Sequence, residues 1–140
     1  MTRRVHEVMT GNPVTVEKLT SLAEAARVMR DADIGDVLVV DEGRLHGILT
    51  DRDIVIRAIA ENRDPADTTV HAVCSAEPVT VRPDDGVDQA VALIRRHALR
   101  RLPVQTEDGE LIGVVTLGDL TIEQDPGSAL AAVTAAEPDT

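Results

Sequence analysis

The stretch Gly47-Ile48-Leu49-Thr50-Asp51-Arg52-Asp53 occurs a second time in the chain, as Gly113-Val114-Val115-Thr116-Leu117-Gly118-Asp119. In each copy an apolar run leads to a threonine, a residue that favours the N-cap position of a helix. The aspartate three residues later falls within the first helical turn, where the helix dipole favours an acid. Each copy therefore predicts a strand that ends at the threonine and a helix that begins there.

Sequence around these stretches repeats in the same order. Residues 5–8, 13–16 and 34–39 correspond to residues 70–73, 78–81 and 99–104. The offset is 65 positions before Asp108 (5 to 70) and 66 after it (47 to 113), which indicates one extra residue in a turn. Ordered similarity of this extent identifies an internal duplication.

Each copy predicts the element order β-α-β-β-α. Brief strands are expected at residues 14–16 and 79–81, directly after prolines. Amphipathic helices follow at about 21–32 and 86–97, where apolar residues recur at i, i+3, i+4 and i+7. Two β-branched runs then flank an acidic, glycine-containing turn, a hairpin pattern, at residues 37–40 and 45–49 and again at 102–105 and 111–115.

The chain has 140 residues, which suits one compact domain or two very small ones. A single copy of about 55 residues buries too little surface to be stable alone, so the copies are expected to pair. The expected boundaries are 1–61 for the first repeat, 62–69 for a linker, 70–125 for the second repeat and 126–140 for an Ala-rich tail. The tail's composition permits either a short helix or disorder.

Composition excludes several classes of function. The chain lacks Phe, Tyr and Trp, so it cannot form an aromatic platform that stacks bases. Its net charge of -11 opposes binding to a nucleic-acid backbone.

Cys74 is the single cysteine, which excludes an intrachain disulfide and predicts a structural thiol. No signal peptide and no apolar run of roughly 20 residues is present, so we expect a cytoplasmic protein without nucleic-acid or membrane partners.

The four histidines do not predict a metal site. His6 and His71 are equivalent in the repeat, which favours a packing role, while His46 falls in a strand and His97 near a helix end. No His-x-x-x-His or Glu-x-x-His spacing occurs. The sequence also lacks a Walker loop, a nucleophile elbow and a nucleophile oriented by a base, so neither catalytic residues nor a bound metal is expected, and the chain is not expected to be an enzyme.

In this β-α-β-β-α context the two opening stretches resemble the Gly-h-h-Thr-x-x-Asp signature of CBS domains, where h is apolar. Residues 97–104, His-Ala-Leu-Arg-Arg-Leu-Pro-Val, are similar to a second characteristic segment of that family. The resemblance covers residues 5 to about 125 and extends to the stand-alone hypoxic response proteins of mycobacteria. It implies an α/β (α+β) fold in which tandem repeats form one pseudo-twofold CBS-domain pair, a Bateman module.

The signature threonines and aspartates are the first candidate binding residues. The N–H groups at a helix start attract anions, and an aspartate one turn later can accept hydrogen bonds from vicinal hydroxyls. In the family this threonine meets phosphate and this aspartate meets ribose. The resemblance therefore implies that Thr50, Asp53, Thr116 and Asp119 bind an adenosine-containing nucleotide: AMP, ADP, ATP or S-adenosylmethionine. The alternative is a helix cap with a first-turn acid, worth ~1 kcal/mol.

A bound base would need aliphatic walls and backbone contacts in this chain. Backbone groups for the purine edge are expected at Thr15, Val16, Thr80 and Val81. The candidate walls are Ile34, Val37, Leu99 and Leu102. Ordinary core packing is the alternative for all of these residues.

Arginines are the candidates for phosphate neutralisation. Arg101 matches a position from which the family often contacts phosphate. Arg100 directly precedes it in the sequence, and Arg52 lies within the first signature stretch. The first copy has Gly35-Asp36 where the second has Arg100-Arg101. The repeats are therefore expected to form two non-equivalent clefts, or one functional cleft that draws Arg101 from the second repeat.

Two functions remain. The first is a non-catalytic regulatory module, without a cofactor, that binds the nucleotide in the cleft between the repeats and signals by a conformational change. It would act as a homodimer, with an unidentified protein partner. The alternative is a ligand-independent, stress-type homodimer with vestigial clefts. The candidate dimer surfaces are formed by Ile54, Val55, Ala58 and Ile59 and by Leu120 and Ile122; the alternative is that these residues complete each protomer's core.

Overall fold

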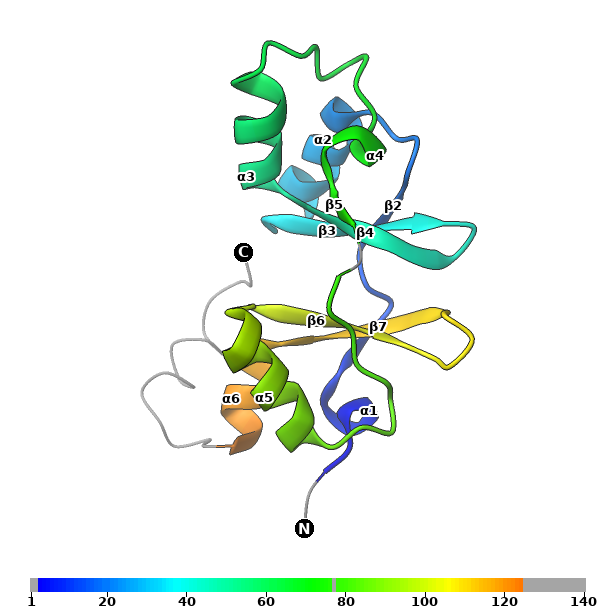
Figure 1. The fold of residues 1–140 in the computed structure, drawn as a ribbon, viewed down its shortest axis with the longest axis vertical. Coiled ribbons are helices and arrows are strands. Elements are labelled where there is room, and N and C mark those ends of the chain that lie inside the picture. Colours follow the sequence, from blue (N-terminus) through cyan, green and yellow to red (C-terminus); the bar gives the residue numbers. More distant parts are fainter. Residues whose placement is uncertain (1–2, 77, 125–140) are drawn as a thin grey trace. The chain divides into compact units, whose positions relative to one another are not determined.

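The computed structural model describes residues 3–76 and 78–124, and the Ala-rich tail expected at 126–140 lies outside them. The chain divides into two compact units. The first unit comprises residues 14–78, and the second unit joins residues 3–13 to residues 79–124 (Figure 1). The two units therefore do not coincide with the two sequence repeats, because residues 3–13 pack with the second repeat.

The first unit is a four-stranded sheet with helices. Its sheet has the order β2-β3-β4-β5, with β2 parallel to β3 and the other neighbours antiparallel. The elements are β2 (Thr15–Glu17), α2 (Leu22–Ala32), β3 (Asp36–Asp41), β4 (Arg44–Thr50), α3 (Asp51–Asp53), η1 (Ile54–Ile59), α4 (Val70–Val73) and β5 (Ser75–Ala76). The helix expected after Thr50 therefore forms, and it widens into π-helical hydrogen bonding over η1.

The second unit repeats this plan with a smaller sheet. Its three strands have the order β1-β7-β6, all antiparallel. The elements are α1 (Val5–Val8), β1 (Thr10–Gly11), α5 (Val87–His97), β6 (Arg101–Gln105), β7 (Leu111–Thr116) and α6 (Leu117–Gln124). Where a strand was expected at 79–81, the structure has a single parallel bridge between Val81 and Val104.

The segment expected as a linker, residues 62–69, packs against the start of α2. Ser21 caps this helix, because its Oγ accepts a hydrogen bond from the Glu24 N–H at 3.1 Å. The Leu22 N–H donates to the Thr68 carbonyl at 2.9 Å and the Ala23 N–H to the Pro65 carbonyl at 3.1 Å. The segment thereby satisfies N–H groups that every helix start leaves without an intrahelical partner.

Each sheet is completed by a short strand that comes from the neighbouring repeat in the sequence. β5 pairs with β4 in the first unit, and β1 pairs with β7 in the second. The signature glycines make this possible. A Cβ on Gly47 would overlap the Ser75 carbonyl oxygen, and a Cβ on Gly113 would lie 2.8 Å from the Thr10 carbonyl oxygen. Glycine is therefore required by the close approach of the added strand.

Each unit has its own aliphatic core. Leu22 and Leu49 are fully buried in the first core, and Leu102 and Val115 in the second. The mixed α/β fold of tandem repeats is confirmed. Within the described part of the chain, no helix combines the length and apolarity needed to cross a membrane.

Candidate functional site

The signature threonine and aspartate hold each other at the start of a helix in both units. The Asp53 N–H donates to Thr50 Oγ1 at 3.0 Å, and the Thr50 N–H donates to Asp53 Oδ2 at 3.0 Å. The same reciprocal pair joins Thr116 and Asp119, at 3.0 and 3.1 Å. The predicted helix cap is therefore present twice, with the aspartate in the place that Glu or Gln takes in a capping box.

This cap leaves chemical capacity on both side chains. A hydroxyl has one O–H donor and two acceptor lone pairs, so Thr116 can accept from the Asp119 N–H and still donate its own hydrogen to a ligand oxygen. A carboxylate has two acceptor oxygens, and the cap uses Oδ2 of Asp119. The pair thus offers a donor and a negatively charged acceptor at one half-buried place.

The signature aspartate of the first unit has a charged neighbour. In the first unit Arg57 Nε lies 3.9 Å from Asp53 Oδ1, and the Asp53 side chain is only 15% exposed. Arg57 also donates to the Val73 carbonyl at 3.1 Å, which ties it to the end of α4. An Asp53–ligand contact would therefore compete with an arginine from the next helical turn.

On the neighbouring strand, the residue opposite the signature threonine is acidic in the first unit and basic in the second. Asp36 is the register partner of Thr50, and Arg101 is the register partner of Thr116. The backbone joins the same elements in both, since the Asp51 N–H donates to the Gly35 carbonyl at 2.9 Å and the Leu117 N–H to the Arg100 carbonyl at 2.6 Å. The two sites thus have equivalent backbone hydrogen bonds and differ in the charge of the residue opposite the threonine.

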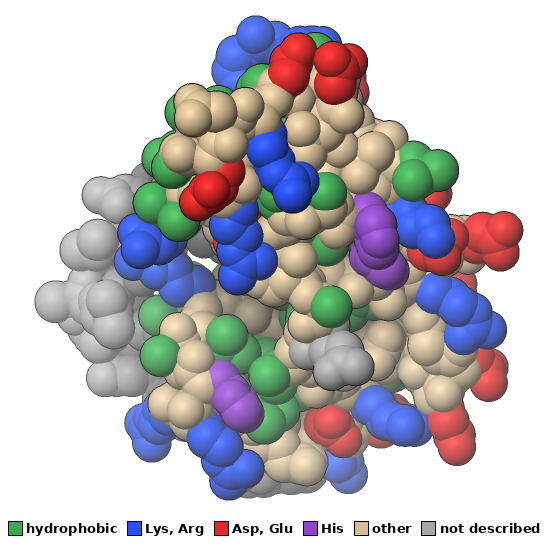
Figure 2. All heavy atoms as spheres, turned by 45° about the horizontal axis from the view of Figure 1, so that its top comes forward, with side chains coloured by type: hydrophobic (Ala, Val, Ile, Leu, Met, Phe, Trp, Pro, Cys, Tyr) green, Lys and Arg blue, Asp and Glu red, His purple; other side chains and the backbone are tan. Residues whose placement is uncertain are grey.

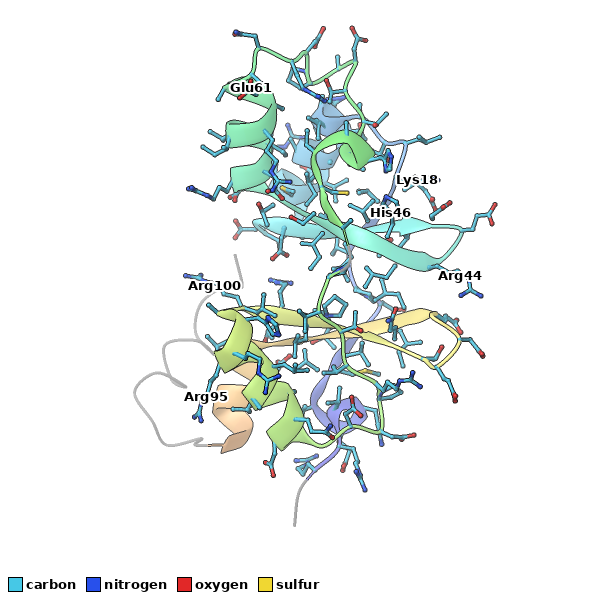
Figure 3. All side chains as sticks on the ribbon, viewed as in Figure 1. Lys18, Arg44, His46, Glu61, Arg95 and Arg100 are labelled. Carbon is cyan, nitrogen blue, oxygen red and sulfur yellow. The ribbon has the colours of Figure 1, made fainter. Side chains whose placement is uncertain are left out.

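The structure brings some of the other candidate residues close to these sites and places others in the cores. Arg100 and Arg101 lie at the start of β6, beside the Thr116 end of β7, and Arg52 is exposed in α3. Figure 3 shows Arg100 at that end of the strand and Arg95 on α5. Val16, Val81, Val37 and Leu102 are core residues, Ile34 and Leu99 are partly buried against the cores, and Thr15 is exposed.

Thr80 takes part in a polar contact at the edge of the second sheet. Gln105 Nε2 donates to Thr80 Oγ1 at 3.1 Å, and the Gln105 N–H donates to the Val81 carbonyl at 3.0 Å. The Val81 N–H donates to the Pro103 carbonyl at 3.1 Å. The backbone of Val81 is thus engaged with β6 on both its polar groups.

Two histidines form a contact that the sequence does not predict. His46 Nε2 lies 2.8 Å from His71 Nδ1, and the ring centroids are 4.9 Å apart. His71 is exposed on α4, so the packing role expected from its repeat equivalence with His6 is wrong for its imidazole. The two residues are 25 positions apart in sequence, and the long-range pairing of β5 with β4 contributes to bringing α4 to this strand.

Cys74 ends α4 as a half-buried thiol. Its Sγ lies near Gly47, where a Cβ would come within 3.0 Å of it. Burial, followed by the nearby charge of Asp53, raises the pKa of Cys74. A thiol held in its protonated form is a poor nucleophile, which agrees with the structural role expected for it.

The second helices expose apolar side chains. Val55, Ile56 and Ile59 on η1 are 54%, 48% and 52% exposed, whereas Ala58 is fully buried. In α6, Leu117 is 39% exposed and Leu120 belongs to the core; the Ile122 side chain lies outside the described part. Apolar side chains are interspersed with charged ones on the face seen in Figure 2. Of the expected dimer surfaces, η1 therefore exposes Val55, Ile56 and Ile59, whereas Ala58 and Ile54 pack with the core.

The family model of the CBS domain matches the chain twice, at residues 5–59 and 70–124. Among curated proteins, the chain is 39% identical over 130 residues to the CBS domain-containing protein YhcV of Bacillus subtilis, covering 90% of this chain and 91% of that one. It is 34% identical over 115 residues to hypoxic response protein 1 of Mycobacterium tuberculosis, covering 81% and 80%.

Solved structures give the same picture. The crystal structure of hypoxic response protein I with two coordinated zinc ions has a TM-score of 0.78 at 32% identity, covering 85% of this chain and 97% of that one. The crystal structure of CBSX2 in complex with AMP has a TM-score of 0.75 at 24% identity, covering 96% and 98%. At that identity the second likeness concerns the fold alone.

Proposed function

The chain belongs to the CBS domain family, and from that premise we propose that it is a non-catalytic regulatory module that senses an adenosine-containing nucleotide. CBS domain pairs are commonly regulatory and ligand-binding, and the CBSX2 structure, which shares this fold, is a complex with AMP. AMP, ADP, ATP and S-adenosylmethionine are the candidate ligands. The observation that carries the proposal is the reciprocal Thr116–Asp119 pair and its Thr50–Asp53 counterpart.

The chemistry of the pair matches a ribose phosphate. The Thr116 hydroxyl hydrogen is directed to a phosphate oxygen while Oγ1 keeps its bond from the Asp119 N–H. Asp119 Oδ1 accepts from ribose hydroxyls while Oδ2 holds the Thr116 N–H. Because the cap fixes both side chains before a ligand arrives, binding costs little side-chain entropy.

Charge favours the second unit as the phosphate site. Arg101 stands opposite Thr116, whereas Asp36 stands opposite Thr50. A cation stabilises a bound phosphate and a carboxylate repels it, most strongly where the site is partly buried. We expect the nucleotide to bind more tightly at Thr116–Asp119, with Arg101 on its phosphate and Arg100 in a weaker, exposed role. Arg52 is proposed to take the same weaker role at the Thr50–Asp53 site of its own unit. Thr15, Val16, Thr80, Val81, Ile34 and Leu102 remain proposed contacts of the base.

The signal is proposed to pass through a homodimer in the cytoplasm to a protein partner. The exposed apolar patch Val55, Ile56 and Ile59 supports association, because exposed apolar groups that cluster mark interaction surfaces. A nucleotide then shifts the population of dimer conformations by no more than its difference in affinity for them.

A simple experiment tests for binding. The chain has no aromatic residue, so a nucleotide that co-purifies is visible directly as absorbance near 260 nm. On stripped protein, calorimetric titration and thermal unfolding with AMP, ADP, ATP and S-adenosylmethionine follow. A ligand at 100 times its Kd adds about 2.7 kcal/mol to the free energy of unfolding.

Matched variants locate the site. Arg101→Asp gives the second unit the residue of the first, and should weaken phosphate-bearing ligands while leaving the Thr116–Asp119 cap intact. Asp119→Ala should abolish binding, and Asp53→Ala should have a smaller effect. If no adenosine ligand binds the unmodified protein, or if Arg101→Asp and Asp119→Ala both bind normally, the proposal is wrong.

Two observations favour the second candidate, a ligand-independent stress-type homodimer. Each Thr–Asp pair already has a structural role as a cap, and Asp36 opposes a phosphate at the first site. That function predicts a concentration-dependent dimer by analytical ultracentrifugation with no response to any of the four nucleotides.

A further inference from the structure

The His46–His71 pair arises from an irregularity in the hairpin of the first unit. In the β3–β4 ladder, Val39 pairs with Gly47 and Val40 pairs with Leu45, so His46 is the extra residue of a β-bulge. A bulge changes the direction in which a side chain points. His46 accordingly lies on the side of the sheet that carries α4 (Figure 3).

The second half of the pair is placed by α4. His71 lies in this short helix, and its N–H donates to the Lys18 carbonyl at 3.0 Å. The next residues form β5, which pairs with β4 through Ser75 and Ala76. His71 is therefore held from both sides, by the end of β2 and by the added strand, with its imidazole over His46.

The second unit repeats the backbone without repeating the pair. In the β6–β7 ladder, Val104 pairs with Gly113 and Gln105 pairs with Leu111, so Ile112 is the bulged residue. The position of His71 is taken there by His6 on α1. Ile112 packs against the core of that unit. The fold therefore does not require a histidine at the bulge, because the second unit forms the same bulge with an apolar side chain.

We propose that His46 and His71 form a dihistidine site for a late divalent transition metal such as Zn²⁺ or Cu²⁺. Imidazole nitrogens suit these ions, whereas Mg²⁺ and Ca²⁺ prefer oxygen ligands. Two nitrogens at about 2.05 Å from a tetrahedral Zn²⁺ lie roughly 3.3 Å apart. The present 2.8 Å separation reaches that value through a small rotation of the exposed His71 ring.

The protonation of the two imidazoles allows a metal ion to replace the hydrogen bond between them. In the neutral pair one facing nitrogen donates its hydrogen to the other. When the metal takes its place, the donor ring carries its N–H on the outer nitrogen instead, so both His46 Nε2 and His71 Nδ1 offer lone pairs. The described residues contain no group of three or more His, Cys, Asp or Glu side chains arranged for a metal. Water completes the coordination.

Titration of tag-free protein with Zn²⁺ tests the site, by calorimetry and by NMR of the histidine ring nitrogens. One Zn²⁺ should bind per chain, and the His46 Nε2 and His71 Nδ1 resonances should shift. His46→Gln and His71→Gln should each abolish this binding. His6→Gln is the matched control, because it removes the equivalent histidine of the second unit, and should leave binding unchanged.

A gain of function completes the test. Ile112→His places a histidine on the second bulge, opposite His6, and should raise the stoichiometry from one to two Zn²⁺ per chain. Circular dichroism verifies that each variant is folded. Absence of saturable Zn²⁺ binding to the unmodified protein would overturn the proposal, as would binding that persists in both His46→Gln and His71→Gln. A loss of binding in Cys74→Ser alone would assign the metal to the thiol and likewise overturn it.

Discussion

The docking of the two added strands depends on the signature glycines, and this dependence can be measured. Gly11 and Gly113 are register partners in the β1–β7 ladder. They differ sharply in the space around them. A Cβ on Gly113 would lie 2.8 Å from the Thr10 carbonyl oxygen and 2.8 Å from Met9 Sδ, whereas a Cβ on Gly11 would have no heavy atom within 4 Å.

We expect Gly113→Ala to lower the free energy of unfolding by about 1–3 kcal/mol, the usual cost of overpacking. The Met9 side chain can rotate away, but the Thr10 carbonyl is backbone and must move with β1. Gly11→Ala should change the same free energy by less than about 0.5 kcal/mol, as for other exposed positions. Gly47→Ala should repeat the larger effect in the first unit, because its Cβ would overlap the Ser75 carbonyl oxygen.

Urea unfolding followed by far-ultraviolet circular dichroism gives these free energies, since the chain lacks the aromatic residues that fluorescence needs. Amide hydrogen exchange across the register pairs of residues 10–11 and 113–114 reports the β1–β7 pairing, and protection there should fall in Gly113→Ala. Equal stability of Gly11→Ala and Gly113→Ala, with unchanged protection across these pairs, would refute the role given to the signature glycine.

Three further predictions concern a cap, a core and a thiol. Ser21→Ala should cost about 1 kcal/mol, because it removes the acceptor of the Glu24 N–H; equal urea midpoints would contradict this. Leu102→Ala, at a fully buried position, should cost about 2–5 kcal/mol, again by urea unfolding. Burial raises the pKa of Cys74, so the folded state favours the neutral thiol. That stabilisation is present below the unfolded pKa of about 8.5 and is lost as pH rises through the folded pKa. Cys74→Ser should therefore reduce the alkaline loss of stability, and an identical pH profile would disprove the assignment.

The local elements were predictable because local chemistry specifies them. The expected helix at 21–32 forms as Leu22–Ala32, with Ser21 as its N-cap, because periodicity and capping both act over a few residues. The hairpins follow from β-branched runs around short turns in the same way. The predicted caps at Thr50 and Thr116 are present for the same reason.

The exchange of β1 and β5 between repeats was not predictable by these means. Each strand has only two residues, too few to show any periodicity. Its partner is chosen by long-range packing, and the signal that remains in the sequence is the glycine at positions 47 and 113. The histidine pair was missed for a related reason. Alternation along β4 does not anticipate a bulge, and the bulge decides that His46 faces α4.

Because the two units share the same backbone arrangement around the Thr–Asp cap, comparing them shows which properties depend on side chains. The Thr–Asp caps of the two units have hydrogen bonds that agree within 0.1 Å (3.0 and 3.0 Å against 3.0 and 3.1 Å). Cap geometry therefore cannot make the units differ in affinity for a nucleotide. The opposed charges of Asp36 and Arg101, on register-equivalent strands, can do so. The bulge follows the same logic, since one backbone carries His46 in the first unit and Ile112 in the second. Differences in function between the halves are accordingly expected at substituted positions such as these, and at Arg57, whose Nε lies 3.9 Å from Asp53 Oδ1 in the first unit.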